Sequence, residues 1–251
     1  MDSSRAEALP IGLTTSLLPK FPDTFSLFNK GSGLSRSHVL GEQQDQSLFL
    51  VSHHRVYSRK PDVVLHSGVG DDDPPLATVK FHSLSQKFSV SLHVGGSAGV
   101  PEEIHIEYEP GFPHGSYSFT EPGRYGKDAV WEWKHARGTE LRGLGGDHEG
   151  WVLGRRENDV LGEVTTSKAS KETTDGEGVF AWASDQASRN RAAVFSFVGA
   201  GKSGAMDERM RLIAIISSLG LFERYRRENR MSVGQVPGGA RIPGILGNFG
   251  V

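Results

Sequence analysis

One segment near the C-terminus, residues 212–222, is apolar on every face of a helix. Its sequence is LIAIISSLGLF. A surface helix carries one apolar stripe, whereas a helix that is hydrophobic all round must be surrounded by protein or by lipid. At 1.5 Å per residue this segment spans about 16 Å, well short of the roughly 30 Å hydrocarbon core of a bilayer. We therefore predict a helix that is enclosed by protein.

The chain that precedes this helix alternates short strand-like runs with turn clusters. In residues 88–94 (FSVSLHV) apolar residues alternate with Ser and His, which is the period of a strand with one buried face. Segments such as GVGDDDPP at 68–75 separate the runs with turn-forming residues. Many short strands and almost no helix before Met206 predict an antiparallel barrel or sandwich rather than a parallel α/β sheet. A closed wall of strands would enclose the apolar helix.

We divide the chain into three parts. Residues 1–30 are predicted to form a flexible arm that ends in an edge strand at 25–28, residues 31–230 the β domain, and residues 231–251 a disordered Gly/Pro-rich tail. Residues 157–177 are predicted to form a long mobile loop.

The helix is expected near 206–228. Asp207 and Glu208 then lie in its first turn, and Arg224, Arg226 and Arg227 follow its last turn, an order that complements the helix dipole. Gly220 lowers helix propensity by about 1 kcal/mol relative to Ala, so we attribute it to close packing.

Composition limits the classes of function. The formal charge of −2 provides no global attraction to nucleic acid or to an anionic membrane, so such contacts would need a local patch. The absence of cysteine excludes disulfides and thiolate metal sites. No secretory signal and no transmembrane segment are recognised. We expect a soluble cytoplasmic protein, with peripheral membrane association and a nuclear location left open.

The segment GAGKSG at residues 199–204 resembles a nucleotide-binding motif. Its three glycines have dinucleotide-binding spacing, and its centre matches the end of a P-loop. A P-loop needs glycine where Ser196 stands, and the chain after Gly204 is too short to supply a second βαβ strand. We therefore expect a tight turn between a strand and the helix, and no cofactor.

No set of residues with the spacing of a catalytic or metal site is found. There is no nucleophile elbow, and the glutamates at 102, 103, 107 and 109 are interpreted as strand surface. His53 and His54 are sequence neighbours and would point to opposite faces of a strand, while His82, His93, His105 and His135 lie on separate strands. We expect structural histidines, no metal ion and no enzymatic activity.

One basic group stands beside aromatic strand residues. Lys134, Arg137 and Arg142 follow the segment VWEW at 130–133, and Arg155 and Arg156 follow Trp151. If these strands are neighbours, the cations cluster beside indole rings, an arrangement that suits phosphate head groups at a membrane surface. The alternative is ordinary surface charge balanced by Glu132 and Glu140.

An ordered set of segments resembles a known superfamily. The segments are DPPLATVKFH at 73–82, WEWKHARG at 131–138, GW at 150–151, VFAWA at 179–183 and FSFVGAG at 195–201, followed by the helix at 208–226. Together they resemble the tubby C-terminal domains, LURP-one-related proteins and phospholipid scramblases, and most closely the small fungal tubby-like proteins. The resemblance covers residues 45–230.

The resemblance implies a closed antiparallel barrel of about twelve strands with the apolar helix through its centre. In tubby domains basic residues on the barrel exterior bind phosphoinositide head groups, and scramblases are linked to calcium-dependent lipid movement. No scramblase-type calcium segment accompanies the helix here, so lipid scrambling is not expected.

Two functions follow as alternatives. The first is a non-enzymatic barrel that binds anionic phospholipid, a phosphoinositide head group, through Lys134, Arg137, Arg142, Arg155 and Arg156. The second is a protein-interaction or regulatory scaffold with no lipid role. Nucleic acid is not an expected partner in either.

Overall fold

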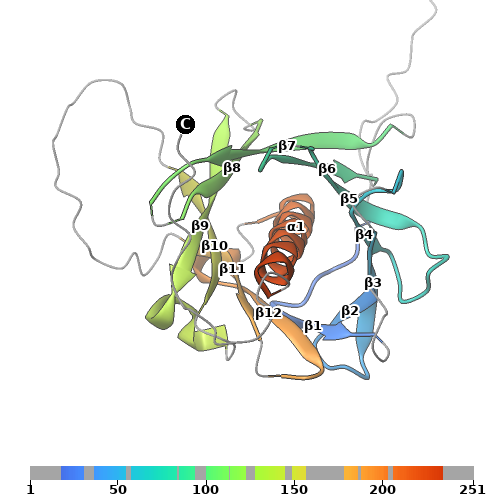
Figure 1. Ribbon diagram of the computed structural model, residues 1–251. Helices are drawn as coiled ribbons and strands as arrows, with labels where there is room; N and C mark the ends of the chain where they lie inside the picture. Colours follow the sequence, from blue (N-terminus) through green and yellow to red (C-terminus); the bar gives the residue numbers. More distant parts are fainter. Residues whose placement is uncertain are drawn as a thin grey trace, which may run out of the picture.

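The computed structural model is a closed barrel of twelve antiparallel strands around one helix (Figure 1). It describes residues 18–30, 37–54, 58–83, 85–93, 100–112, 114–122, 128–144, 149–156, 178–185, 188–202 and 206–233. The strands are β1 (Thr24–Asn29), β2 (Ser37–Gly41), β3 (Ser47–His53), β4 (Val63–His66), β5 (Pro75–Phe81), β6 (Phe88–Leu92), β7 (Glu102–Glu109), β8 (Ser116–Glu121), β9 (Ala129–Arg137), β10 (Glu149–Arg156), β11 (Gly178–Ser184) and β12 (Arg191–Phe197). This confirms the fold that the sequence and the resemblance predict.

Each strand pairs with its neighbours along the chain, and β12 closes the barrel by pairing with β1. This up-and-down order follows from the turn clusters, which reverse the chain between consecutive strands. The barrel begins at Thr24, within the region that the sequence assigns to an N-terminal arm. The predicted 157–177 loop, and the rest of the predicted arm and tail at 1–17 and 234–251, lie outside the described residues.

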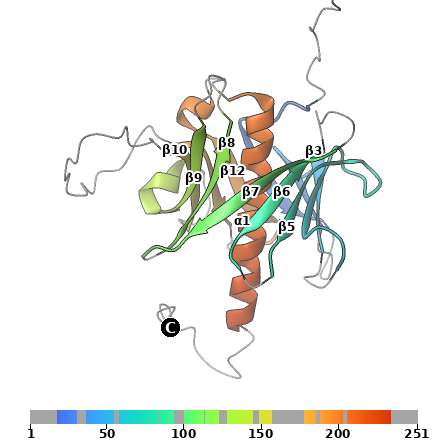
Figure 2. The ribbon, with the colours of Figure 1, turned by 90° about the horizontal axis from the view of Figure 1, so that it is seen from above.

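The helix α1 (Glu208–Val233) runs along the barrel axis, and its C-terminal end projects beyond the strands (Figure 2). Leu212, Ile213, Ile215 and Ile216 are completely buried, as predicted for a helix enclosed by protein. The wall contributes large aromatic side chains to the same core: Phe25, Phe88, Trp133, Phe180, Trp182, Phe195 and Phe197. Among the described residues, no helix is long and apolar enough to cross a bilayer.

The helix continues to Val233 instead of ending near 228. Arg226 and Arg227 therefore lie within it, not after its last turn. Both pair with Glu223 across one helical turn, with Nε to carboxylate oxygen distances of 2.8 and 2.7 Å, and such spacing stabilises a helix. At the other end, the side chain of Asp207 accepts a 2.8 Å hydrogen bond from the backbone N–H of Met210 and caps the first turn.

A short outer layer covers one side of the barrel. The 3₁₀ helix η2 (Gly138–Leu144) contacts β9, β10, β11 and β12. Its Leu141 and Leu144 are buried against small outward-facing residues of the wall, Ala181 and Ala183 among them. Part of the outer face of β9–β12 is thus buried under η2.

Candidate binding groove between β7 and β8

The strands β7 and β8 pair over only part of their lengths. Three residue pairs join them: Glu107 with Ser118, Tyr108 with Tyr117, and Glu109 with Ser116. Residues 102–106 of β7 pair only with β6, and residues 119–121 of β8 pair only with β9. The two strands therefore separate beyond the third pair and leave an opening in the barrel wall, which we call the β7–β8 groove.

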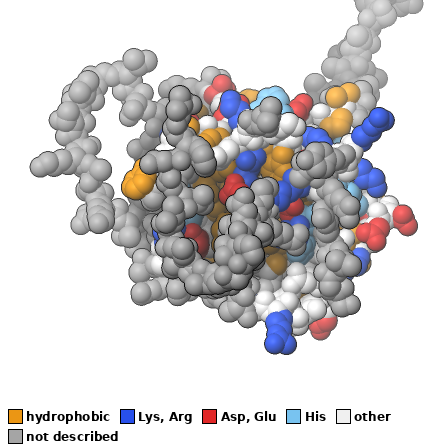
Figure 3. Space-filling view, in the orientation of Figure 1, with side chains coloured by type: hydrophobic (Ala, Val, Ile, Leu, Met, Phe, Trp, Pro, Cys, Tyr) orange, Lys and Arg blue, Asp and Glu red, His pale blue; other side chains and the backbone are white. Residues whose placement is uncertain are grey.

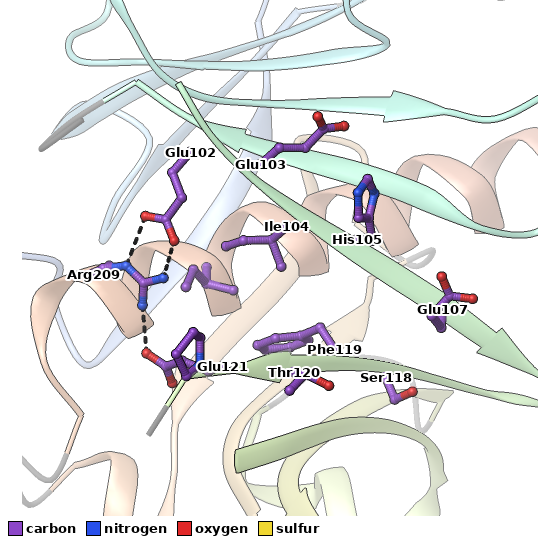
Figure 4. A pocket seen from close by; sticks show the side chains of 12 residues that line it. Glu102, Glu103, Ile104, His105, Glu107, Ser118, Phe119, Thr120, Glu121 and Arg209 are labelled. Atoms are coloured by element: carbon purple, nitrogen blue, oxygen red, sulfur yellow. Dashed lines mark hydrogen bonds and ion pairs between the residues drawn. The ribbon is translucent and has the colours of Figure 1, made fainter. Parts of the chain in front are cut away.

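The β7–β8 groove holds a cavity of about 380 Å³ (Figure 4). This volume lies within the range of pockets that bind small ligands or side chains. Buried apolar side chains of Ile104, Phe119 and Ile213 belong to its lining. The polar lining residues are Glu102, Glu103, His105, Glu107, Ser118, Thr120, Glu121 and Arg209.

Arg209, in the first turn of α1, lies between the two separated strands (Figure 4). Its Nε donates a hydrogen bond of 3.1 Å to Glu102 of β7, and a second guanidinium nitrogen also bonds this carboxylate. A third nitrogen lies 2.6 Å from Glu121 of β8. The hydrogen bonds to Glu102 are the main reason that the pKa of Arg209 is raised, so the guanidinium stays charged. Arg209 therefore links β7 to β8 where their backbone pairing has ended.

The groove is acidic although the chain as a whole is nearly neutral. Four glutamates line it, at 102, 103, 107 and 121, against the single cation of Arg209 among the lining residues. Two of them neutralise Arg209, and Glu107 forms an ion pair with Lys87 on the outer wall. Glu103 is more exposed than Glu102 and stands on the groove rim. A hollow lined by charge of one sign concentrates counter-ions, which here are cations.

The backbone contributes to the groove as well. Within the described part of the chain, residues 102–106 and 119–121 each have a strand neighbour on one side only. A strand edge presents a row of N–H and C=O groups that can pair with another extended chain. The β7–β8 groove therefore has two such edges that face each other across an acidic hollow.

The predicted basic residues do not form one cluster. Lys134 and Arg137 are three residues apart on β9, and residues an odd number apart in a strand point to opposite faces. The same holds for the neighbours Arg155 and Arg156 of β10. Along the strands, Arg156 pairs with Val130, several residues from Lys134.

Carboxylates already contact three of these cations. Arg156 donates to both oxygens of Glu109 at 3.0 and 2.8 Å and to both oxygens of Glu132 at 3.3 and 2.8 Å. Lys134 Nζ lies 3.6 Å from Glu132, and Arg137 lies 3.0 Å from Glu149. Hydrogen bonds to Glu109 and Glu132 raise the pKa of Arg156.

The space-filling view along the barrel axis shows Lys and Arg side chains next to Asp and Glu side chains around the end of the barrel that faces the viewer (Figure 3). Arg155 is exposed at the opposite end of β10 from Glu149. Arg142 belongs to η2, and its side chain lies outside the described part of the chain.

Two interpretations from the sequence agree with local contacts in the structure, the first with close packing and the second with hydrogen bonds. A Cβ atom at Gly201 would lie 2.0 Å from the carbonyl oxygen of Val179, and Gly199 has a positive φ of 47°. Gly199 and Gly201 therefore serve a tight turn, as predicted, whereas Ser203 and Gly204 of the segment lie outside the described residues. His82 and His105 both contact the hydroxyl of Ser89, at 2.9 and 3.1 Å, which agrees with a structural role.

Arg209 and its partners Glu102 and Glu121 were not recognised as an ion-pair cluster from the sequence. Glu102 was interpreted as strand surface, and Glu121 was not singled out. The sequence did indicate that such ion pairs exist, because Arg209 and Arg211 lie on a helix predicted to be enclosed by strands. A charge in such a place needs partners of opposite charge on the wall.

Comparisons with protein-family models, with curated proteins and with solved structures find no match to this chain. The resemblance to the tubby superfamily therefore stays a prediction. The functional assignment depends on the geometry of the molecule.

Proposed function

We propose that this protein is a non-enzymatic binding module that accepts an extended, basic segment of a partner protein in the β7–β8 groove. This corresponds to the protein-interaction alternative from the sequence. The observation that carries the proposal is the short pairing of β7 with β8, which leaves two strand edges without a neighbour beside an acidic hollow.

Addition of a strand to an exposed sheet edge is a common mode of peptide recognition. Backbone hydrogen bonds supply affinity in this mode, and pockets for alternate side chains supply specificity. The edge at residues 119–121 of β8 and the edge at 102–106 of β7 offer the backbone groups. The cavity of about 380 Å³ offers a place for one or more side chains.

The charge of the groove supports a basic ligand. Glu103 and Glu107 have side chains on the outer face of β7. Glu103 can pair with lysine or arginine from a peptide, and Glu107 can do so in exchange for its exposed ion pair with Lys87. Such rim charges mainly increase the association rate and make binding sensitive to salt. An acidic peptide would be repelled by the same residues.

Phospholipid binding through the basic group has weaker support. An anionic head group at Arg137 or Arg156 would have to displace Glu149, or Glu109 and Glu132, from bonds of 2.8 to 3.0 Å. Lipid binding is retained as one outcome of the test below.

The test measures fluorescence anisotropy of short labelled peptides with the full chain. A peptide of alternating lysine and valine is expected to bind, and a peptide of alternating glutamate and valine is not. The variant Glu103→Lys with Glu107→Lys should weaken binding by about tenfold or more. Both side chains are exposed on the outer wall, so the fold is expected to persist, which circular dichroism checks.

Two controls isolate the mechanism. Glu42→Lys makes the same charge change at an exposed turn before β3 and should leave binding unchanged. A lysine–valine peptide with N-methyl groups at alternate residues cannot form strand hydrogen bonds on one edge and should bind much more weakly. Equal binding of the methylated peptide, or binding only to phosphoinositide vesicles with loss in Arg156→Glu, contradicts the proposal.

A further inference from the structure

Three potential metal ligands meet at the barrel mouth from which the C-terminal end of α1 emerges. They are His114 before β8, His135 of β9 and Glu149 at the start of β10. One ligand atom from each lies within 4.8 Å of the other two. This cluster is at the opposite end of the β7–β8 pair from the groove.

The barrel holds two of the three ligands close together. In the register of β9 with β10, His135 pairs with Trp151, and Glu149 precedes that pair by two residues. The His135 ring packs edge-on against the Trp151 indole with centroids 5.4 Å apart. The His135 Nε2 atom lies 3.2 Å from Glu149 Oε1. Two ligands at 2.0–2.1 Å from a tetrahedral zinc ion are separated by about 3.3 Å, so this pair already has the required spacing.

The third ligand approaches from the chain between β7 and β8. The imidazole of His114 stacks on that of His135 with ring centroids 3.9 Å apart. His114 is exposed, and it can move the remaining distance without disturbing the core.

A cation already contacts two of the three ligands. The same guanidinium nitrogen of Arg137 lies 2.9 Å from His114 Nε2 and 3.0 Å from Glu149 Oε1. Lone pairs of an imidazole and a carboxylate therefore point at one positive group. The Arg137 side chain is 60% exposed and can swing toward solvent.

We propose that His114, His135 and Glu149 bind a divalent transition metal ion, with zinc as the best fit, in place of the Arg137 guanidinium. Two imidazole nitrogens and one carboxylate oxygen are a donor set that zinc takes with a fourth position left open. Cobalt(II) and nickel(II) accept the same donors and serve as probes. Arg137 acts as a competitor that fills the site when metal is scarce.

The test titrates cobalt(II) into the full-length protein purified without a histidine tag. Visible d–d absorption reports tetrahedral coordination, and displacement by zinc gives the zinc affinity. We expect one equivalent of metal per chain. The variant His114→Ala should lose about tenfold or more in affinity, and Arg137→Ala should gain affinity because the competing cation is gone.

The matched control is His82→Ala, which removes another exposed histidine outside the cluster and should leave cobalt binding unchanged. Glu149→Gln keeps the shape of the side chain and should also weaken binding. Equal cobalt affinity in the native protein, His114→Ala and Glu149→Gln overturns the proposal. None of these substitutions touches the β7–β8 groove, so this result is independent of the peptide assay.

Discussion

The indole Nε1 of Trp133 donates a hydrogen bond of 3.1 Å to the hydroxyl oxygen of Ser217, and this bond joins the barrel wall to the helix inside the core. Both residues are completely buried. The Ser217 hydroxyl in turn donates to the carbonyl oxygen of Ile213 at 2.7 Å. Apolar contacts are non-directional, so a directional bond of this kind helps to fix how α1 is placed against β9.

Ser217→Ala tests this bond. The substitution leaves the buried Trp133 N–H without an acceptor, which costs about 1–3 kcal/mol of the free energy of unfolding. Urea denaturation measures the change. Ser218→Ala is the matched control, because the equally buried Ser218 donates its hydrogen bond to the carbonyl oxygen of Ile215 within α1 and not to the wall. An equal loss in both variants would show that the bond to the wall contributes nothing.

Gly220→Ala should destabilise the protein although alanine favours a helix. A Cβ atom at Gly220 would lie 2.9 Å from Cε2 of Phe88, whose ring is completely buried. Overpacking of a core costs about 1–3 kcal/mol, which exceeds the gain of about 1 kcal/mol in helix propensity. Gly143→Ala is the control, because no atom lies within 4 Å of the added Cβ there. Thermal melting of the two variants is compared, and a higher Tm for Gly220→Ala would contradict the packing argument.

Glu223 should make stability depend on pH in the acid range. Burial disfavours its charged form, but hydrogen bonds and charges from His53, Arg226 and Arg227 outweigh burial and lower its pKa to about 2. The unfolded carboxyl has its ordinary pKa of about 4.5 and binds its proton first as the pH falls. The contribution of Glu223 is therefore complete above about pH 5 and is lost toward pH 2, a change on the order of 3 kcal/mol.

His53 also makes the free energy of unfolding decrease as the pH falls, but this decrease begins at a higher pH than that of Glu223. Burial is the main cause that lowers the pKa of His53 from 6.5, so the unfolded state takes up the proton first below that pH. Urea denaturation between pH 7 and pH 3 measures both effects. In Glu223→Gln the loss below about pH 5 should become shallower, while the loss due to His53 begins at the same pH. Identical pH profiles for the two proteins would exclude a role for the Glu223 carboxylate.

Arg209→Gln should weaken the link between β7 and β8. The guanidinium bonds Glu102 and Glu121, but its side chain is 32% exposed, so solvent screening limits the loss to about 1 kcal/mol. Hydrogen exchange should become faster at residues 119–121, and the basic peptide should bind more tightly to the more acidic groove. The exposed Arg189→Gln serves as the control for loss of one positive charge. Unchanged exchange at 119–121 would show that Arg209 does not hold the strands.

The local residue pattern was sufficient to predict that α1 is buried and which face of β6 is buried. The apolar segment at 212–222 predicted the buried helix, and the two-residue period at 88–92 predicted the buried face of β6. Gly220 predicted close packing, which the contact with Phe88 confirms. The helix end was less accurate, because α1 continues to Val233 and not to about 228.

Neighbours across the barrel could not be predicted from the same pattern. The hypothesis that the basic group from 134 to 156 clusters depended on such neighbours, yet strand alternation sends Lys134 and Arg137 to opposite faces. Glu132 of the same strand contacts Lys134, and Glu149 of β10 contacts Arg137. The cluster of His114, His135 and Glu149 has no regular sequence spacing and arises from the pairing of β9 with β10 and the chain before β8.

The residue pattern therefore predicted short antiparallel strands, in a barrel or a sandwich, and an apolar helix enclosed by protein, because residue periodicity and helix length are local properties. The resemblance added the expectation of a closed barrel. The β7–β8 groove, where the barrel wall opens, could be recognised only in the tertiary structure. Only three residue pairs join β7 to β8, and Arg209 reaches Glu121 across 88 positions of the chain. Such contacts depend on strand register around the whole closed barrel, and register is set by all the strands together rather than by any one segment.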